Sequence, residues 1–212
     1  MKPAFDLTLY LVLNPSLCAE TGIVGTAVAA AEAGATMVQL RDKTASADRL
    51  IATGRALKEA LAGTGTLLVV NDSAEAAIAI GADGLHIGQD DMSAATARAL
   101  IGPDIILGLS AESEELASAV DPDVVDYAGL GPVFATPSKP DHKSPIGMAG
   151  LTRLVAACPV PAVAIGGLKA EHAPAVFKAG ARGMAVVSAI CGTPDPGAAT
   201  RAIIAAIGGR RP

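Results

Sequence analysis

Eight short aliphatic runs alternate with alanine-rich stretches along the chain, and this alternation restricts the possible folds more than any other feature. The stretches between the runs have helix-forming composition. Alternating strands and helices predict a parallel sheet, and eight such units predict closure into a (β/α)8 TIM barrel, one α/β domain over residues 1–212. The predicted strands are 7–14, 37–43, 66–72, 84–89, 105–110, 126–134, 162–167 and 183–188, and predicted helices include 24–33, 47–62, 74–80, 94–100 and 170–179.

A repeated joint supports the barrel. Gly34, Gly81 and Gly180 each follow a helical stretch and precede a predicted strand. Glycine accepts the left-handed backbone conformation that ends a helix, so we expect three equivalent helix-to-strand joints. The alternative architecture is an open doubly wound sheet, which favours a glycine-rich turn after the first strand. The sequence 14–16 there reads Asn-Pro-Ser instead.

Composition and charge exclude several classes of partner. The 16 Lys and Arg residues against 21 Asp and Glu residues give a net charge of −5, which opposes binding to nucleic acid or to an anionic membrane. No uncharged stretch reaches the roughly 20 apolar residues of a spanning helix. The three cysteines, at unrelated spacings, suggest neither a disulfide framework nor a zinc site, and we expect a reducing, cytoplasmic location.

In a barrel of this kind, functional residues lie at the carboxyl ends of the strands. The second predicted strand ends in a polar sequence in which alternation places Gln39, Arg41 and Lys43 on one face. If that face points inward, the three polar groups need a ligand. The alternative is an outward face whose charges are solvated.

The next two predicted strands end in acidic residues. The third ends at Asn71 and Asp72, and the fourth is followed by Asp91. In neighbouring strands the two carboxylates would approach one another and form a hard oxygen site suited to Mg²⁺. Each aspartate also precedes a helical stretch, so each could instead cap a helix. Next to Arg41 and Lys43, a metal site would complete a receptor for a diphosphate.

The last two predicted strands end in residues typical of a phosphate site. Gly167 ends the seventh strand, and Val187 and Ser188 end the eighth. Loops at these two positions commonly bind phosphate through backbone N–H groups. The alternative for the glycine is an ordinary tight turn.

A long irregular segment, 131–145, follows the sixth predicted strand. Its length is unusual for a strand-to-helix joint, so we interpret it as a lid that closes on an anion through Thr136, Ser138 and Lys139. The alternative is a solvated surface loop. We expect His86 to be a satisfied inward side chain rather than a catalyst.

These residues belong to motifs that resemble the thiamine phosphate synthase family, in order and over nearly the whole chain. The motifs are VQLRDK (38–43), VND (70–72), HIGQDD (86–91), GLS (108–110), YAGLGPVF (127–134), TPSK (136–139), AIGG (164–167) and VVSAI (186–190).

The resemblance implies a transferase that joins hydroxymethylpyrimidine diphosphate to hydroxyethylthiazole phosphate with release of diphosphate. It implies that Gln39 holds the pyrimidine and that Asp72 and Asp91 hold Mg²⁺. It places Ser110 with the lid hydroxyls at the reacting centre. It also implies diphosphate binding by Arg41, Lys43, Asn71 and Lys139, and thiazole phosphate binding by Gly167, Val187 and Ser188.

The sequence departs from the family pattern at two positions. Glu112 replaces a usual His, and Ser138 replaces a usual Thr while keeping the hydroxyl. One rival is a thiazole tautomerase of the same fold, which tends to carry a His where this chain has Pro132. A second rival is a non-catalytic phosphometabolite-binding barrel. The sequence leaves the oligomeric state open, a homo-oligomer included.

Overall fold

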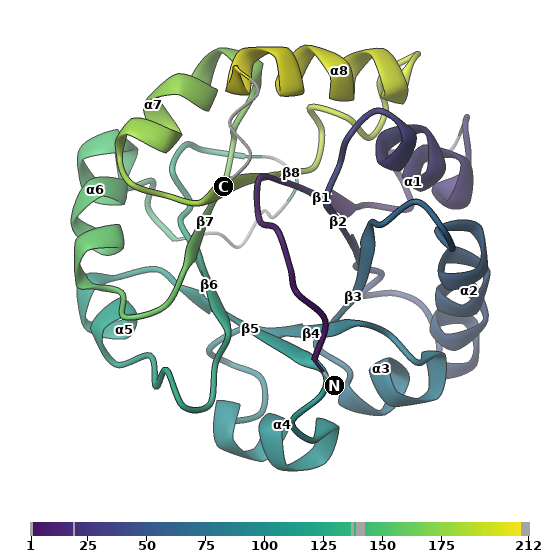
Figure 1. Cartoon of the computed structure of the whole chain (residues 1–212), viewed down its shortest axis with the longest axis horizontal. Helices are drawn as coiled ribbons and strands as arrows, with labels where there is room; N and C mark the ends of the chain where they lie inside the picture. The colour runs from purple at the N-terminus through teal and green to yellow at the C-terminus, as the bar shows by residue number, and fades with distance from the viewer. Residues whose placement is uncertain (1, 19, 137, 139–142, 209–212) are drawn as a thin grey trace.

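The structure, a computed structural model, describes residues 2–18, 20–136, 138 and 143–208, and its strands close into a barrel (Figure 1). Neighbours along the chain pair in parallel, and β1 also pairs with β8, which completes the ring. The predicted (β/α)8 architecture is confirmed, and the open doubly wound sheet is wrong. The strands are β1 Leu9–Leu13, β2 Met37–Leu40, β3 Leu67–Asn71, β4 Gly84–Ile87, β5 Ile106–Ala111, β6 Tyr127–Leu130, β7 Ala162–Ile165 and β8 Gly183–Val186.

Helices lie outside the ring of strands, one after each strand (Figure 1). The helical stretch expected over 170–179 is divided, with a short 3-10 helix before α7. The helices are α1 Ile23–Glu32, α2 Ala47–Ala60, α3 Ala74–Ile80, α4 Ala94–Ile101, α5 Glu114–Ser118, α6 Gly147–Ala157, α7 Ala173–Lys178 and α8 Pro196–Ile207, with the 3-10 helix η1 at Ala170–His172.

Local sequence fixes where several helices begin. Five N-cap side chains accept a hydrogen bond from a backbone N–H of the first helical turn, which satisfies one of the donors left unpaired at a helix start. The capping residues are Ser46, Ser73, Ser93, Ser113 and Asp195, for α2, α3, α4, α5 and α8.

The repeated glycine joint is present as expected. Gly34, Gly81 and Gly180 follow α1, α3 and α7 with φ angles of 110°, 69° and 95°. These angles lie in the region that L-residues other than glycine rarely adopt. Each glycine therefore lets the chain leave its helix and turn directly into the next strand.

The strands are buried on both sides, which explains their uniformly aliphatic composition. Outward side chains pack against the helices in one large cluster, and inward side chains fill the barrel in a second, smaller one. The buried members of the inner cluster are Leu7, Tyr10, Val12, Met37, Val69, Ile106, Tyr127, Val163 and Ala185.

The segment before β1 covers the end of the barrel where the strands begin. The Phe5 ring packs against the Tyr127 ring at a centroid distance of 6.0 Å, and Leu7 is buried. Lys2 Nζ lies 2.6 Å from Oδ1 of Asp126, the residue just before β6. This end of the barrel is therefore closed, and the open end is where the strands finish.

Within the described ranges, no helix combines the length and apolar character needed to span a bilayer.

Candidate active site

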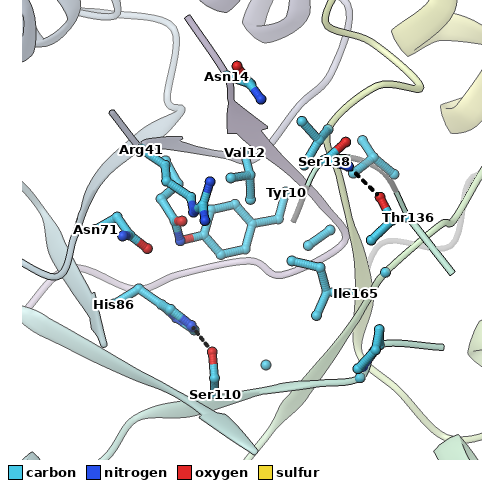
Figure 2. Close-up of a pocket in the computed structure, with 18 of the residues that line it drawn as sticks. Tyr10, Val12, Asn14, Arg41, Asn71, His86, Ser110, Thr136, Ser138 and Ile165 are labelled. Carbon is cyan, nitrogen blue, oxygen red and sulfur yellow. Dashed lines mark hydrogen bonds between the residues drawn. The ribbon is translucent and has the colours of Figure 1, made fainter. Parts of the chain in front are cut away.

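A cavity of about 180 Å³ lies where the strands end, and all eight strands or the loops after them contribute to its lining. Figure 2 shows Arg41, Asn71, His86 and Ser110 arranged around Tyr10. Twelve residues singled out from the sequence line this one cavity: Gln39, Arg41, Lys43, Asn71, Asp72, Asp91, Ser110, Thr136, Ser138, Gly167, Val187 and Ser188. The thirteenth, Lys139, lies outside the described residues.

The second strand is shorter than expected, yet its polar residues face inward. β2 ends at Leu40, so Arg41 and Lys43 stand on the following loop. Asp42 shapes that loop, because its Oδ1 accepts hydrogen bonds from Thr44 N–H, Thr44 Oγ1–H and Ala45 N–H. Gln39, Arg41 and Lys43 all line the cavity, so the alternative of an outward face is wrong, while the Lys43 side chain stays 55% exposed to solvent.

Asp72 does not cap a helix. Ser73 is the N-cap of α3 and accepts from Ala76 N–H, while the Asp72 backbone N–H donates to the His86 carbonyl at 2.8 Å. Asp72 is also the only described residue other than glycine with a positive φ, 65°. That conformation turns the chain abruptly at the end of β3, and the Asp72 side chain lines the cavity.

Asp91 does not cap a helix either. α4 begins at Ala94 and its cap is Ser93. Asp91 Oδ2 instead accepts a hydrogen bond from Gly88 N–H at 2.7 Å, which holds the loop after β4 in a tight turn. The capping explanation is therefore wrong for both aspartates.

The two carboxyl groups interact, and a cation stands beside them. Burial raises the pKa of Asp72 above its ordinary value, and the Asp91 carboxyl raises it further through a hydrogen bond and charge repulsion. Lys43 Nζ, 3.6 Å from Asp72 Oδ2, opposes that rise. Two adjacent carboxylates without a helix to cap are a donor set that fits Mg²⁺.

The described residues contain no group of three or more His, Cys, Asp or Glu side chains that could hold a metal alone. Mg²⁺ commonly binds through one or two carboxylates together with substrate phosphates and water. A pair of carboxylates therefore suits a metal that arrives with, or is completed by, a phosphorylated ligand.

The loops after β7 and β8 form the opposite side of the cavity. Gly166 and Gly167 have φ angles of 104° and 63°. A Cβ at Gly166 would lie 2.5 Å from Pro132 Cβ, and one at Gly167 would lie 2.8 Å from Phe134 Cβ. These glycines are thus required by backbone conformation and by close packing against the loop after β6.

After β8, the chain forms a compact turn. The Val187 carbonyl accepts from Ile190 N–H at 3.1 Å and from Cys191 N–H at 2.8 Å. Val187 and Ser188 line the cavity at the start of this turn. Their backbone is therefore held in place next to the glycine turn after β7.

The segment interpreted as a lid is fixed at its beginning. Val133 N–H donates to the Ile165 carbonyl at 2.9 Å, and Phe134 N–H donates to the Gly166 carbonyl at 3.0 Å. Residues 131–133 are buried, so this part belongs to the barrel rather than to a lid. Farther along, Ser138 N–H donates to Thr136 Oγ1 at 3.2 Å, beside the cavity (Figure 2).

Five side chains form a hydrogen-bonded row through the barrel interior, which we call the relay. Gln39 Nε2 lies 2.8 Å from Tyr10 Oη, which lies 3.0 Å from Tyr127 Oη. Tyr127 Oη lies 2.9 Å from His86 Nδ1. His86 Nε2 lies 2.9 Å from Ser110 Oγ (Figure 2). Burial lowers the pKa of His86 to about 4, against a smaller opposing effect of Asp91. His86 is inward and satisfied, as expected.

Sequence reasoning missed the two tyrosines of the relay. Tyr10 and Tyr127 are isolated polar residues inside otherwise aliphatic strands, and both are fully buried. The available signal was their inward phase, because Tyr10 alternates with outward Leu9 and Leu11.

Glu112, which stands where the similar family usually has His, lines the same cavity.

Comparison with known proteins gives a consistent result. A family model described as thiamine monophosphate synthase matches residues 9–190. The chain is 47% identical over 203 residues to a thiamine-phosphate synthase of Azorhizobium caulinodans, with 96% of each protein covered. It is 48% identical over 207 residues to a thiamine-phosphate synthase of Xanthobacter autotrophicus, with 98% of each covered.

Solved structures agree with the sequence matches. A thiamine phosphate pyrophosphorylase from Pyrococcus furiosus superposes with a TM-score of 0.86 at 33% identity, with 96% of each chain covered. A 3-hexulose-6-phosphate synthase superposes with a TM-score of 0.68 at 20% identity, which is a likeness of fold alone.

Proposed function

The chain belongs to the thiamine monophosphate synthase family. We propose that residues at the open end of its barrel catalyse the joining of hydroxymethylpyrimidine diphosphate to hydroxyethylthiazole phosphate, giving thiamine phosphate and diphosphate. The observation that carries the proposal is the Asp72 and Asp91 pair beside Arg41 and Lys43 on one cavity wall. A single phosphate needs no such set, whereas a diphosphate with its metal matches it in charge.

The reaction exchanges one bond for another. The C–O bond between the exocyclic carbon of the pyrimidine and the diphosphate breaks, and the electron pair leaves with diphosphate. The thiazole nitrogen lone pair then forms the new C–N bond. Because the electron-rich aminopyrimidine stabilises the intermediate cation, catalysis depends on stabilising the departing charge and on positioning the nucleophile.

The leaving group is held by the strand ends β2 to β4. Arg41 offers a planar fork of donors that suits phosphate oxygens, and Lys43 adds a point charge. Asn71, at the end of β3, adds an amide donor. The family resemblance also assigns Lys139, which lies outside the described residues, to the diphosphate. Asp72 and Asp91 would hold Mg²⁺, which when bound supplies Lewis-acid stabilisation of the leaving diphosphate.

The remaining lining residues serve the two rings and the second phosphate. Gln39 would bind the pyrimidine from inside the barrel. Ser110, Thr136 and Ser138 would hydrogen-bond around the reacting carbon. The backbone N–H groups of Gly167, Val187 and Ser188 would bind the thiazole phosphate on the opposite wall. No general base is needed, since the nucleophile is a neutral ring nitrogen.

The two rival functions fit the site less well. A tautomerase has no use for a set of diphosphate ligands, and this chain has Pro132 in place of the tautomerase His. A non-catalytic phosphate-binding barrel has no use for the carboxylate pair.

The three free cysteines support a reducing, cytoplasmic compartment for the reaction.

The proposal is tested by mixing purified protein with both substrates and measuring diphosphate and thiamine phosphate. We expect equal amounts of both products, dependent on Mg²⁺.

Arg41→Ala should lower turnover by at least about tenfold with little change in melting temperature, because it removes charge stabilisation rather than core packing. Absence of both products with folded protein, or full activity in the Arg41→Ala variant, would contradict the assignment.

A further inference from the structure

The relay is an unusual interior for a barrel of this fold. Barrel interiors are normally filled by layers of aliphatic side chains, but here hydroxyl, imidazole and amide groups lie in one continuous hydrogen-bonded row. The backbone makes room for it: a Cβ at Gly108 would overlap the Tyr127 ring and lie 2.5 Å from His86 Nδ1. At Gly129, a Cβ would lie 3.2 Å from His86 Cε1.

Counting protons gives the row a direction. Gln39 Nε2 can only donate, so Tyr10 Oη accepts at that contact. The single Tyr10 hydroxyl proton must then go to its other partner, Tyr127 Oη. Tyr127, which accepts from Tyr10, donates its own proton to His86 Nδ1.

The direction continues through the imidazole. A neutral imidazole has one N–H donor and one acceptor nitrogen. His86 is buried and its two ring nitrogens face the hydroxyl groups of Tyr127 and Ser110, so a neutral ring satisfies both contacts with one donor and one acceptor. With Nδ1 accepting from Tyr127, the proton lies on Nε2 and is donated to Ser110 Oγ.

We propose that Tyr10, Tyr127 and His86 are positioning residues whose directional hydrogen bonds fix the His86 Nε2–H tautomer and set the polarity of both ends of the relay. At one end, the Gln39 amide is held by its Nε2 and keeps its carbonyl oxygen as an acceptor for a ligand. At the other end, Ser110 Oγ accepts from His86 and keeps its hydroxyl proton as a donor for a ligand. Both end residues line the cavity.

The polarity has a consequence for recognition, which rests on the proposed function. A ring that carries an amino group and a ring nitrogen offers a donor to Gln39 and an acceptor to Ser110. A ring with the opposite arrangement would face two mismatched buried groups. Such mismatches cost more than a lost contact, because a buried polar group is left unpaired.

The relay can be reversed by a single isosteric substitution. In Gln39→Glu, the side chain at the first position becomes an acceptor for the Tyr10 hydroxyl. Tyr127 must then donate to Tyr10, His86 must donate from Nδ1, and Ser110 must donate to Nε2. We therefore expect the His86 proton to move from Nε2 in the parent protein to Nδ1 in the Gln39→Glu variant.

The experiment is ¹⁵N NMR of the histidine rings near neutral pH, in protein without ligand. The chain has three histidines, so His142→Asn and His172→Asn variants assign the His86 signals by elimination. The parent should show a protonated Nε2 and an unprotonated Nδ1. Gln39→Glu should exchange the two assignments.

The matched control is the Tyr10→Phe substitution, which removes the hydroxyl that connects Gln39 to the rest. In the Tyr10→Phe protein, His86 Nδ1 is the one relay partner left to accept the Tyr127 hydroxyl proton, so the Nε2–H tautomer should remain. Adding Gln39→Glu to that background should no longer move the proton. A purely electrostatic effect of the new carboxylate would move it in both backgrounds and would overturn the relay.

Two other results would also overturn the proposal: an Nδ1–H tautomer in the parent, or no change in a folded Gln39→Glu variant. If Gln39→Glu fails to fold, Tyr127→Phe replaces it. That variant removes the donor to Nδ1, and an unchanged pair of His86 shifts would contradict the proposal. Because the readout uses the protein alone, a failed synthase assay and a failed relay are separate results.

Discussion

Asp72 combines two unfavourable features in one residue. Its backbone has a φ of 65°, and its carboxyl lies half-buried beside a second carboxyl. A non-glycine residue in a sparsely populated conformation costs of order 1–3 kcal/mol, and such residues cluster at ligand sites. Ser73 caps α3, so the Asp72 side chain is not needed to begin that helix. The proposed role in holding a cation would account for both features.

The metal role is tested by Asp72→Asn and Asp91→Asn. Each variant should raise the Mg²⁺ concentration that gives half-maximal activity, because an amide keeps the shape but loses the charge that a hard dication prefers. Stability should be unchanged or slightly higher, since asparagine tolerates the left-handed conformation and one repulsive charge is removed. Mg²⁺ titration of the steady-state rate and thermal melting make the two measurements.

The matched control for these variants is Asp90→Asn. Asp90 is exposed and lies next to Asp91 in sequence, outside the cavity lining. Asp90→Asn removes the same charge from the same loop. The Mg²⁺ concentration that gives half-maximal activity should equal that of the parent. Curves for Asp72→Asn and Asp91→Asn that superimpose on the parent curve would remove the metal assignment.

At the starts of α3 and α4, the residues that cap the helix are different from the aspartates that line the cavity. Asp72 and Asp91 stand one and two residues before the true caps, Ser73 and Ser93. Aspartate and serine are equally good caps, so the sequence alone left the first helical residue undecided by that margin. The hydrogen bonds that Ser73 Oγ accepts from Ala76 N–H and Ser93 Oγ accepts from Thr96 N–H decide it in favour of the serines.

Ser73→Ala and Ser93→Ala should each lower the free energy of unfolding by about 1 kcal/mol, the usual cost of losing an N-cap. The Mg²⁺ requirement of the remaining activity should stay that of the parent. Urea denaturation measures the first effect and rate titration the second. Ser46→Ala, at the cap of α2 and away from the cavity, gives the reference cost. A changed Mg²⁺ requirement in Ser73→Ala alone would show that the serine acts at the site as well.

For the whole molecule, the sequence predicts the architecture well because the barrel is a repeated pattern. Three glycine joints and eight aliphatic runs determine closure, and closure brings residues such as Arg41 and Ser188 to one end. The relay is not predictable in this way. Its tyrosines are single polar residues in apolar strands, and only the register across the barrel brings them together. The expected lid over 131–145 is wrong at its beginning, because length alone does not reveal that Val133 and Phe134 bond to Ile165 and Gly166.

Burial of His86 couples global stability to pH. The folded pKa is about 4 and the ordinary value is 6.5, so the unfolded chain binds more protons between these values. The His86 contribution to the free energy of unfolding should be constant above about pH 6.5. It should fall by on the order of 3 kcal/mol as pH drops towards 4. Urea denaturation across this range measures the slope. His86→Asn should flatten it, and an equal slope in that variant would assign the acid sensitivity to other groups.

The two tyrosines of the chain are both members of the relay, and tryptophan is absent. Near-ultraviolet absorption and intrinsic emission therefore come almost entirely from two rings inside the catalytic barrel. Tyr10 also lines the cavity, so an arriving ligand changes the surroundings of one of these chromophores directly. The protein thus carries its own optical reporter, and occupancy of the site can be followed by tyrosine emission without any attached dye.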